Sequence, residues 1–235
     1  HIDDASWIWA TTNRPVIHQF DDWSTYTMAE GSSDVEFLKF RKEFDVKEGE
    51  GELIFDVSGD ERFYLTLDGE FVARGPNRGP VENWQYQTYS VKNLKPGRHV
   101  FEAVVWKVGI HSPMAQVSHR GGFVFSAEGA YDAKLTTGKT TWQVAVIDNV
   151  KALKIPNEAW EVGGQFEVKG RGPYAVEPKV WRDAVVVRNH AGMKGRGICG
   201  VRTVGWMLFP TQLPDQTEER ISVGTVRAVA RNVEW

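Results

Sequence analysis

The side chains best suited to chemistry lie between residues 74 and 86, in a polar loop rich in glycine, proline and arginine. Guanidinium, amide and carboxylate groups in such a loop can bind sugar hydroxyls, and an aromatic ring can stack on the apolar face of a sugar. The candidate carbohydrate-binding residues are Arg74, Asn77, Arg78, Glu82, Asn83, Trp84 and Tyr86.

A structural role would explain the same loop. Arg74 and Arg78 would then hold the loop by salt bridges, and Trp84 would pack on a neighbouring domain. Loop glycines and buried aromatic residues are common in β-sandwich proteins, so the structural role is the more frequent outcome. Both interpretations stay open at this point.

A second group of oxygen-bearing side chains suits a hard cation such as calcium. These are Asp56, Ser58, Asp60 and Glu61, which fall together in one short stretch. Calcium prefers carboxylate and hydroxyl oxygens. Ordinary turn chemistry is the competing explanation, because short polar side chains bond to their own backbone in turns.

No other motif supports a cofactor or a transition metal. Residues 195–200 match G-x-G-x-x-G, but a dinucleotide site needs a preceding strand and a following helix N-terminus. The residues that follow are β-branched and interrupted by glycine, so we interpret the match as a hairpin turn. The spacing of His111 and His119 has no zinc signature. Apart from calcium, we expect no cofactor.

Catalytic groups are equally hard to find. A glycosidase needs two carboxyl groups at a fixed separation, and nothing singles out a pair among the 31 acidic residues. Cys199 lies in a glycine-rich loop without an obvious base. We therefore expect this segment to be non-catalytic, with no catalytic residue of its own.

Extended strands must position the polar loop, since helical periodicity is scarce. Phe63, Leu65 and Leu67 share one face of a strand that runs into Asp68-Gly69. That dipeptide favours the positive φ angles of a two-residue hairpin turn. The polar loop therefore follows the second strand of a β-hairpin, which spans residues 62–76.

Other strands show the same alternation. Residues 37–46 place apolar side chains on one face, with Lys42 as the one charge among them, and residues 53–57 alternate in the same way. Residues 99–106 are apolar on both faces, which predicts a central, buried strand. Many short strands with frequent turn signals predict an all-β fold, an antiparallel β-sandwich.

Composition narrows the class of protein. The 235 residues are 41% hydrophobic and 25% charged, as in ordinary globular proteins. A net charge of -3 gives no reason to expect a nucleic-acid partner, and no apolar run is long enough for a membrane span. Cys199 is the only cysteine, which excludes an intrachain disulfide and is compatible with the cytoplasm or with secretion.

A boundary is expected near residue 150. Residues 1–150 would form the sandwich, and residues 151–235 would supply a linker and strands of a second β domain. The linker is rich in glycine and proline from residue 156 to residue 178. An alternating strand continues to the last residue, so we expect the chain to be the front of a longer protein.

Several stretches together resemble the N-terminal region of bacterial α-L-rhamnosidases, the inverting glycoside hydrolases of family 78. The resemblance is carried by the hairpin Arg62–Pro76 and by five further motifs: Ala5-Ser6-Trp7-Ile8-Trp9, Phe40-Arg41-Lys42-Glu43-Phe44, Tyr86-Gln87-Thr88-Tyr89, Leu94-Lys95-Pro96-Gly97 and Trp206-Met207-Leu208-Phe209-Pro210-Thr211-Gln212-Leu213-Pro214. It covers most of the chain, and each motif alone is moderately specific.

This resemblance implies a jelly-roll module of the galactose-binding type, followed by the start of a second β domain. Catalysis in such enzymes lies in an (α/α)6 barrel further along, so the implied partners are the chain's own downstream catalytic domain and a rhamnose-containing glycan. The implied role of this chain is that of a non-catalytic N-terminal portion that acts in domain packing or in substrate positioning. The implied compartment is the bacterial periplasm or the cell exterior. Two alternatives stay open: an independent, lectin-like carbohydrate-binding module, and the front domain of a β-galactosidase-like enzyme.

Overall fold

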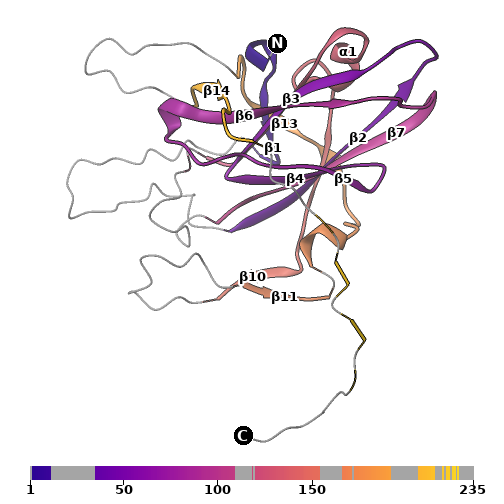
Figure 1. The fold of residues 1–235 in the computed structure, drawn as a ribbon. Helices are drawn as coiled ribbons and strands as arrows, with labels where there is room; N and C mark the ends of the chain where they lie inside the picture. The colour runs from indigo at the N-terminus through magenta and orange to yellow at the C-terminus, as the bar shows by residue number, and fades with distance from the viewer. Residues whose placement is uncertain are drawn as a thin grey trace, which may run out of the picture.

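Two six-stranded β-sheets face each other in the computed structural model of this chain (Figure 1). The structure describes residues 2–11, 35–108, 118, 120–153, 166–170, 172–191, 206–214, 219, 221, 222, 224, 225 and 227. The first sheet has the order β13-β1-β8-β3-β6-β14, with the bounds β1 Trp7–Trp9, β3 Leu53–Asp60, β6 Trp84–Val91, β8 Gly122–Ala127, β13 Val185–Arg188 and β14 Leu208–Pro210.

The second sheet has the order β12-β9-β2-β7-β4-β5, with the bounds β2 Glu36–Val46, β4 Arg62–Leu67, β5 Glu70–Gly75, β7 Gly97–Lys107, β9 Gln143–Val146 and β12 Arg182–Asp183. A separate two-stranded ribbon, β10 Val150–Ala152 and β11 Phe166–Val168, lies below it in Figure 1. Helices are short: α1 Asp132–Leu135 and the 3-10 turns Ile2–Asp4, Val81–Asn83, Gly129–Tyr131 and Pro173–Ala175. The predicted all-β sandwich is confirmed, while its jelly-roll connectivity stays a prediction.

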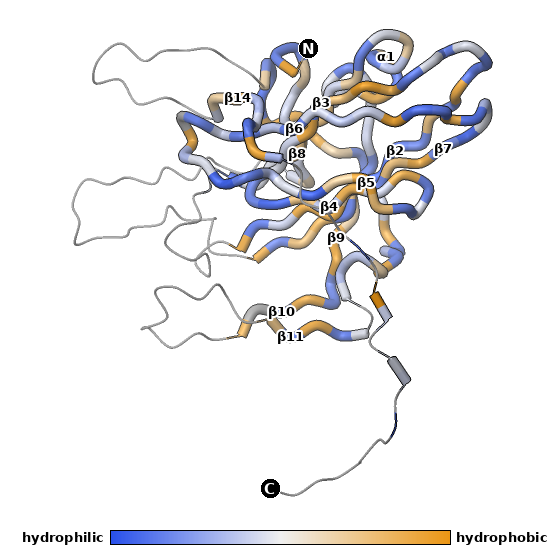
Figure 2. The backbone as a smooth tube through the Cα atoms, in the orientation of Figure 1, coloured by the Kyte–Doolittle hydropathy of each residue, from blue (hydrophilic) through white to orange (hydrophobic). Residues whose placement is uncertain are grey.

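The main hydrophobic core lies between the two sheets. Alternate residues of each strand supply it, for example Phe63, Leu65 and Leu67 of β4 facing Phe123 and Phe125 of β8. Figure 2 shows the matching interleaving of orange and blue residues along the strands. Such burial of alternate apolar side chains is the main force that holds sandwich sheets together.

The Asp68-Gly69 hairpin forms as predicted. Both turn residues have positive φ angles, 52° and 83°, as the tight two-residue turn requires. The turn is also fastened to β7, because the backbone N–H of Val100 donates to Oδ1 of Asp68 at 2.9 Å. His99 lies beside the same carboxylate, with its Nδ1 2.6 Å from Oδ2.

Strand β7 is central and largely buried, as the sequence predicts for residues 99–106. It pairs with β2 on one side and with β4 on the other. Lys42 of β2 lies on the same face as the core residues, just beyond Arg41, where the pairing of β2 with β9 ends. Beyond that point the ammonium group donates to Oγ1 of Thr140 and to the carbonyl of Thr141.

Strands from beyond residue 150 complete both sheets. β12 pairs with β9, β13 pairs with β1, and β14 pairs with β6, the last pair being parallel. The described part of residues 151–235 therefore contributes to the sandwich as well as forming the β10–β11 ribbon. The boundary expected near residue 150 stays a prediction, and so does a second β domain.

Segment 172–183 covers the outer face of β2, which the sequence does not show. Lys39 is only 5% exposed there. Its ammonium group donates to the carbonyl of Val176 at 3.1 Å and lies 3.0 Å from a carboxylate oxygen of Glu102. Arg41 contacts both Glu102 and Glu177, and its guanidinium group lies 4.2 Å from the ring centre of Trp181.

Some sequence predictions lie outside the described residues. These are the G-x-G-x-x-G match at 195–200, Cys199, His111 and His119. Across the part of the chain that is described, no helix combines the length and apolar character needed to cross a membrane.

Candidate functional site

A pocket of about 530 Å³ opens at the end of the hairpin that is remote from its turn. We call it the arginine pocket; its described lining is Arg62, Phe63, Tyr64, Arg74, Gly75, Pro76, Asn77, Arg78, Trp106 and Tyr174. Its volume falls within the range of about 300–1,000 Å³ typical of small-molecule sites. It contains three residues of the predicted binding set: Arg74, Asn77 and Arg78.

Strand register explains why these groups meet. Arg62 lies opposite Trp106 across the β4–β7 pair, and Tyr64 lies opposite Arg74 across the β4–β5 pair. Neighbouring Phe63 points into the core, so Arg62 and Tyr64 point outward from the second sheet. Directly opposite side chains are about 5 Å apart at their Cβ atoms, which places cations and rings side by side.

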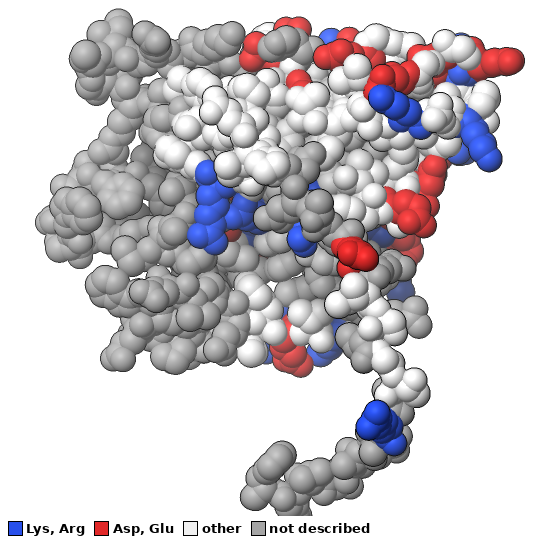
Figure 3. Space-filling model, in the orientation of Figure 1, with Lys and Arg blue, Asp and Glu red and all other residues white. Residues whose placement is uncertain are grey.

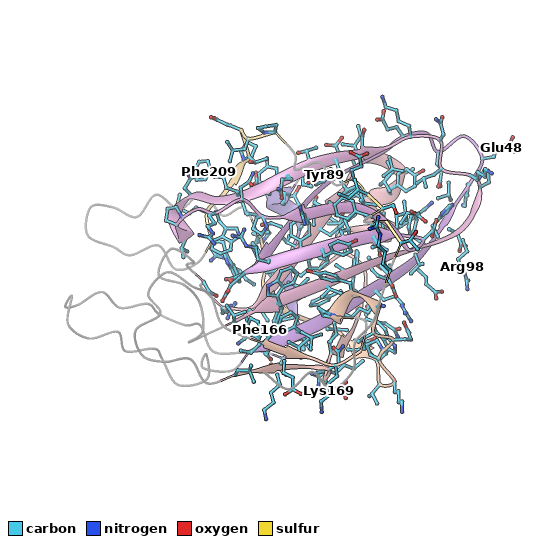
Figure 4. The ribbon with its side chains drawn as sticks, turned by 60° about the horizontal axis from the view of Figure 1, so that its bottom comes forward. Glu48, Tyr89, Arg98, Phe166, Lys169 and Phe209 are labelled. Atoms are coloured by element: carbon cyan, nitrogen blue, oxygen red, sulfur yellow. The ribbon has the colours of Figure 1, made fainter. Side chains whose placement is uncertain are left out.

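Aromatic rings form a row along this outer face. Tyr174 stacks on Tyr64, with ring centres 4.3 Å apart and planes at 20°, and lies 6.1 Å from Trp106. Trp106 in turn stacks on Phe37 at 5.8 Å, and Phe37 meets Phe166 of β11 edge to face at 5.9 Å. Figure 4 shows Phe166 on the ribbon beneath the sandwich, on the side away from Tyr89 and Phe209.

The arginines give the pocket a positive field. Burial lowers the pKa of Arg62, and the nearby charge of Arg78 lowers it further, while the carboxylate of Glu61 acts in the opposite direction. None of the described lining residues is acidic. In the space-filling view, basic side chains gather near the middle of the described surface and carboxylates lie mostly towards its upper and right-hand edges (Figure 3).

Buried contacts hold the loop that carries Arg74 and Arg78. Arg62 donates from Nη1 to the carbonyl of Pro76. Asn77 donates from Nδ2 to Oγ1 of Thr211 at 2.6 Å, so this amide nitrogen ties the loop to the segment after β14. The side chain of Gln87 packs against Gly75. A Cβ added to Gly75 would lie 2.3 Å from Oε1 of Gln87, so a larger residue does not fit there without movement of Gln87. Asn77 is thus placed to hold the loop in position.

The remaining predicted binding residues lie elsewhere. Asn83 is exposed and accepts a hydrogen bond from Nε2 of Gln85 at 3.0 Å. Tyr86 is half-buried, and burial, followed by the carboxylates of Asp56 and Asp3, raises the pKa of its hydroxyl. The side chain of Glu82 lies outside the described residues.

Trp84 does not face the pocket, contrary to its place in the predicted set. It is 2% exposed and belongs to a second buried group, which we call the tryptophan cluster: Ile2, Ala5, Trp7, Trp84, Val124, Ala191 and Trp206. Val124 alternates with the core residues Phe123 and Phe125, so this cluster lies on the outer face of the first sheet. In this position the ring of Trp84 cannot stack on a sugar.

Residues proposed as calcium ligands all bond to protein groups. Asp56 accepts from Oγ1 of Thr88 at 2.6 Å, and Ser58 donates to the carbonyl of Gln85 at 2.7 Å. Asp60 accepts from Oγ of Ser118, the backbone N–H of Arg120 and Nε1 of Trp206, while Oε1 of Glu61 accepts from the backbone N–H of Val108.

Among the described residues, Asp56, Asp60 and Glu61 do not form a metal-binding group. Each of these side chains already has at least one protein partner. Calcium at this stretch therefore stays a prediction from the sequence alone.

The sequence did not identify Tyr64, Trp106 and Tyr174 as site residues. The outward position of Tyr64 follows from the alternation of the hairpin. Trp106 lies opposite Arg62 because of the β4–β7 register, which the alternation of a single strand does not determine. Tyr174 is 47% exposed and comes from a segment far along the chain, for which the local sequence carries no signal. These three rings, and not Trp84, are the Tyr and Trp side chains in the described lining of the arginine pocket.

No protein family model matches the chain, and no curated protein matches it either. Solved structures do. The chain is similar to a GH78 family rhamnosidase of Bacillus sp. GL1, with a TM-score of 0.63 and 21% identity over 90% of this chain and 20% of that chain. It is also similar to an alpha-L-rhamnosidase from Dictyoglumus thermophilum, with a TM-score of 0.51 and 13% identity over 90% of this chain and 22% of that chain.

The chain shares the fold of part of these rhamnosidases. At such identities the likeness establishes the fold alone, and the chain spans about a fifth of the length of both rhamnosidase chains. A lectin from Pleurotus ostreatus overlaps more loosely, with a TM-score of 0.45 and 15% identity over 92% of this chain and 47% of that chain, which is too weak a likeness to bear on function.

Proposed function

We propose that this chain is the non-catalytic N-terminal portion of a rhamnosidase-like glycoside hydrolase and that it holds the glycan near a catalytic domain. The observation that carries this proposal is the shared fold, which extends over 90% of the chain but only 20% of a GH78 family rhamnosidase. The parent reaction would be the inverting hydrolysis of terminal α-L-rhamnosides. On the same resemblance, the proposed compartment is the periplasm or the cell exterior.

The chemistry of the described residues supports a role without bond cleavage. The arginine pocket offers hydrogen-bond donors and rings, which suit the binding of a sugar. It offers no pair of carboxyl groups within its described lining, and such a pair is what glycoside cleavage requires. Positioning of substrate by a neighbouring domain raises the local concentration of glycan at the reacting centre.

A cleavage assay tests this proposal. The isolated chain should not hydrolyse a chromogenic α-L-rhamnoside, whereas the protein encoded by the full reading frame should hydrolyse it with inversion at the anomeric carbon. Turnover by the isolated chain would refute the non-catalytic role. A full-length protein that is inactive on every rhamnoside yet active on another glycoside would refute the rhamnosidase assignment.

The arginine pocket also favours a second candidate, an independent carbohydrate-binding module. Such a module would bind its sugar with the same affinity whether or not any catalytic domain is attached. Titration of the isolated chain and of the full-length protein with the same glycans separates the two proposals. Binding that requires the full-length protein would refute the independent module.

A further inference from the structure

We propose that the arginine pocket binds an acidic saccharide, a pyranose that carries a carboxylate or sulfate group. The inference rests on the proposed role in glycan binding and adds the chemical class of the glycan. Three guanidinium groups, those of Arg62, Arg74 and Arg78, line one pocket together with three aromatic rings. Neutral sugars need donors and acceptors in comparable numbers, whereas arginine supplies donors only.

The cations and the rings lie in the arrangement that such a ligand needs. Arg74 is directly opposite Tyr64, and Arg62 is directly opposite Trp106. A ring that stacks on Tyr174 or Trp106 would therefore have guanidinium groups beside it, where a substituent on the pyranose can reach them. Planar guanidinium groups bind carboxylate and sulfate oxygens in a bidentate manner, which fixes the orientation of the sugar as well as adding affinity.

Electrostatic repulsion between the arginines of the pocket agrees with this arrangement. Burial is the largest cause that lowers the pKa of Arg62, the charge of Arg78 also lowers it, and the carboxylate of Glu61 acts in the opposite direction. An anion between the two cations relieves that repulsion. The Tyr174 side chain is 47% exposed, so a ligand can reach this ring from solvent.

Matched pairs of ligands test the proposal by isothermal titration of the 235-residue chain. Methyl α-D-galacturonide and methyl α-D-galactoside differ only in the carboxylate at C6, and galactose 6-sulfate supplies the sulfate counterpart. Inorganic sulfate controls for the anion alone. We expect both acidic sugars to bind at least about tenfold more tightly than the neutral glycoside, since a charge-assisted contact is worth at least that factor.

Substitutions at exposed arginines test whether the ligand binds in the arginine pocket. Arg74→Gln and Arg78→Gln should each weaken binding of the acidic sugars about tenfold and weaken binding of the neutral glycoside by a smaller factor, because the neutral sugar loses only an uncharged hydrogen bond. Arg98→Gln is the matched control, because Arg98 is exposed and lies about 25 Å from Trp106 along β7. Figure 4 shows Arg98 near the tip that also carries Glu48.

A ring substitution separates stacking from charge. Tyr174→Ala should weaken acidic and neutral sugars alike, because it removes a surface on which either can stack. Phe209→Ala is its control, a 43% exposed aromatic residue on β14 of the other sheet. All five substituted side chains are exposed, so the variants should keep the thermal midpoint of the parent chain, which is measured alongside.

Each outcome decides the matter. Tighter binding of acidic sugars that falls with Arg74→Gln and Arg78→Gln but not with Arg98→Gln supports the proposal. Equal affinity for acidic and neutral sugars would overturn the acidic preference and leave the glycan-binding role standing. Inorganic sulfate that binds as tightly as galactose 6-sulfate would show a simple anion site. Absence of all binding would overturn the inference, while the rhamnoside cleavage assay still judges the parent enzyme separately.

Discussion

Replacing Trp206 with alanine should destabilise the whole sandwich, although this residue lies close to the end of the described chain. Its indole is fully buried and stacks on Trp7, with ring centres 4.0 Å apart and planes at 17°. Its Nε1 donates to Oδ2 of Asp60 at 2.9 Å, and Asp60 is itself buried. The substitution therefore removes a large ring from the tryptophan cluster and a donor from a buried carboxylate.

The size of the effect follows from these two losses. Truncation of a buried tryptophan to alanine costs about 3–5 kcal/mol in free energy of unfolding. Loss of a donor to a buried carboxylate places the expected value in the upper part of that range, about 4–5 kcal/mol, because hydrogen bonds to charged groups are the stronger ones. For a chain of this length such a loss lowers the thermal midpoint by roughly 10–20 °C.

Urea unfolding followed by tryptophan fluorescence measures this free energy, with the thermal midpoint as a check. Trp206→Phe should cost less than Trp206→Ala, because phenylalanine keeps a ring that can stack on Trp7 while it loses the donor and part of the buried ring area. Phe209→Ala is the control and should change the free energy by less than about 0.5 kcal/mol, as an exposed position allows. A Trp206→Ala variant within 1 kcal/mol of the parent would refute the argument that this segment is docked on the first sheet.

Two further outcomes follow from the ion pairs of the second sheet. Burial is the largest single influence on the pKa of His99, and it lowers that pKa. The hydrogen bonds with the Lys95 backbone and the Asp68 carboxylate, together with the charge of Asp68, outweigh burial, so the pKa lies above 6.5. The stabilisation from His99 is thus fully present below pH 6.5 and is lost as the pH rises through the raised pKa. The free energies of unfolding of the parent and of His99→Gln should therefore differ more at pH 5.5 than at pH 8.5. An equal difference at both pH values would contradict this. Lys39→Ala should release segment 172–183 and speed trypsin cleavage after Lys179 and Arg182 about 5- to 30-fold, for a loss of about 1–2 kcal/mol of docking free energy. Lys92→Ala, which removes an exposed and long ion pair, is the control, and equal cleavage rates in the two variants would show that Lys39 does not hold the segment.

Local features of the fold could be predicted because local chemistry causes them. Asp68-Gly69 determines its turn through backbone preference alone, and alternation along residues 62–67 determines which side chains enter the core. The same alternation places Tyr64 on the outer face, beside Arg74. This much of the arginine pocket is therefore contained in the hairpin sequence.

Contacts between distant segments could not be predicted in this way. Lys39 occupies a position that alternation assigns to solvent, yet it is buried and contacts the segment at 172–183. Trp84 has the sequence context of a loop aromatic, yet it is covered by Trp206 and its neighbours in the tryptophan cluster. Tyr174, which lines the pocket, belongs to segment 172–183, the same segment that contacts Lys39. Each case depends on which parts of the chain meet, and short-range patterns do not encode that.

The late arrival of three edge strands has a consequence for the chain as it is made. β9, β1 and β6 keep unpaired backbone edges until β12, β13 and β14 have been synthesised. At about 5–20 residues per second, that interval ranges from a few seconds for β9 to tens of seconds for β1. Open sheet edges are templates for pairing with other chains, so the nascent sandwich passes through a period in which it can aggregate. Substitutions in β12, β13 or β14 should therefore reduce the soluble yield in cells even where they leave the thermal midpoint of the purified protein nearly unchanged.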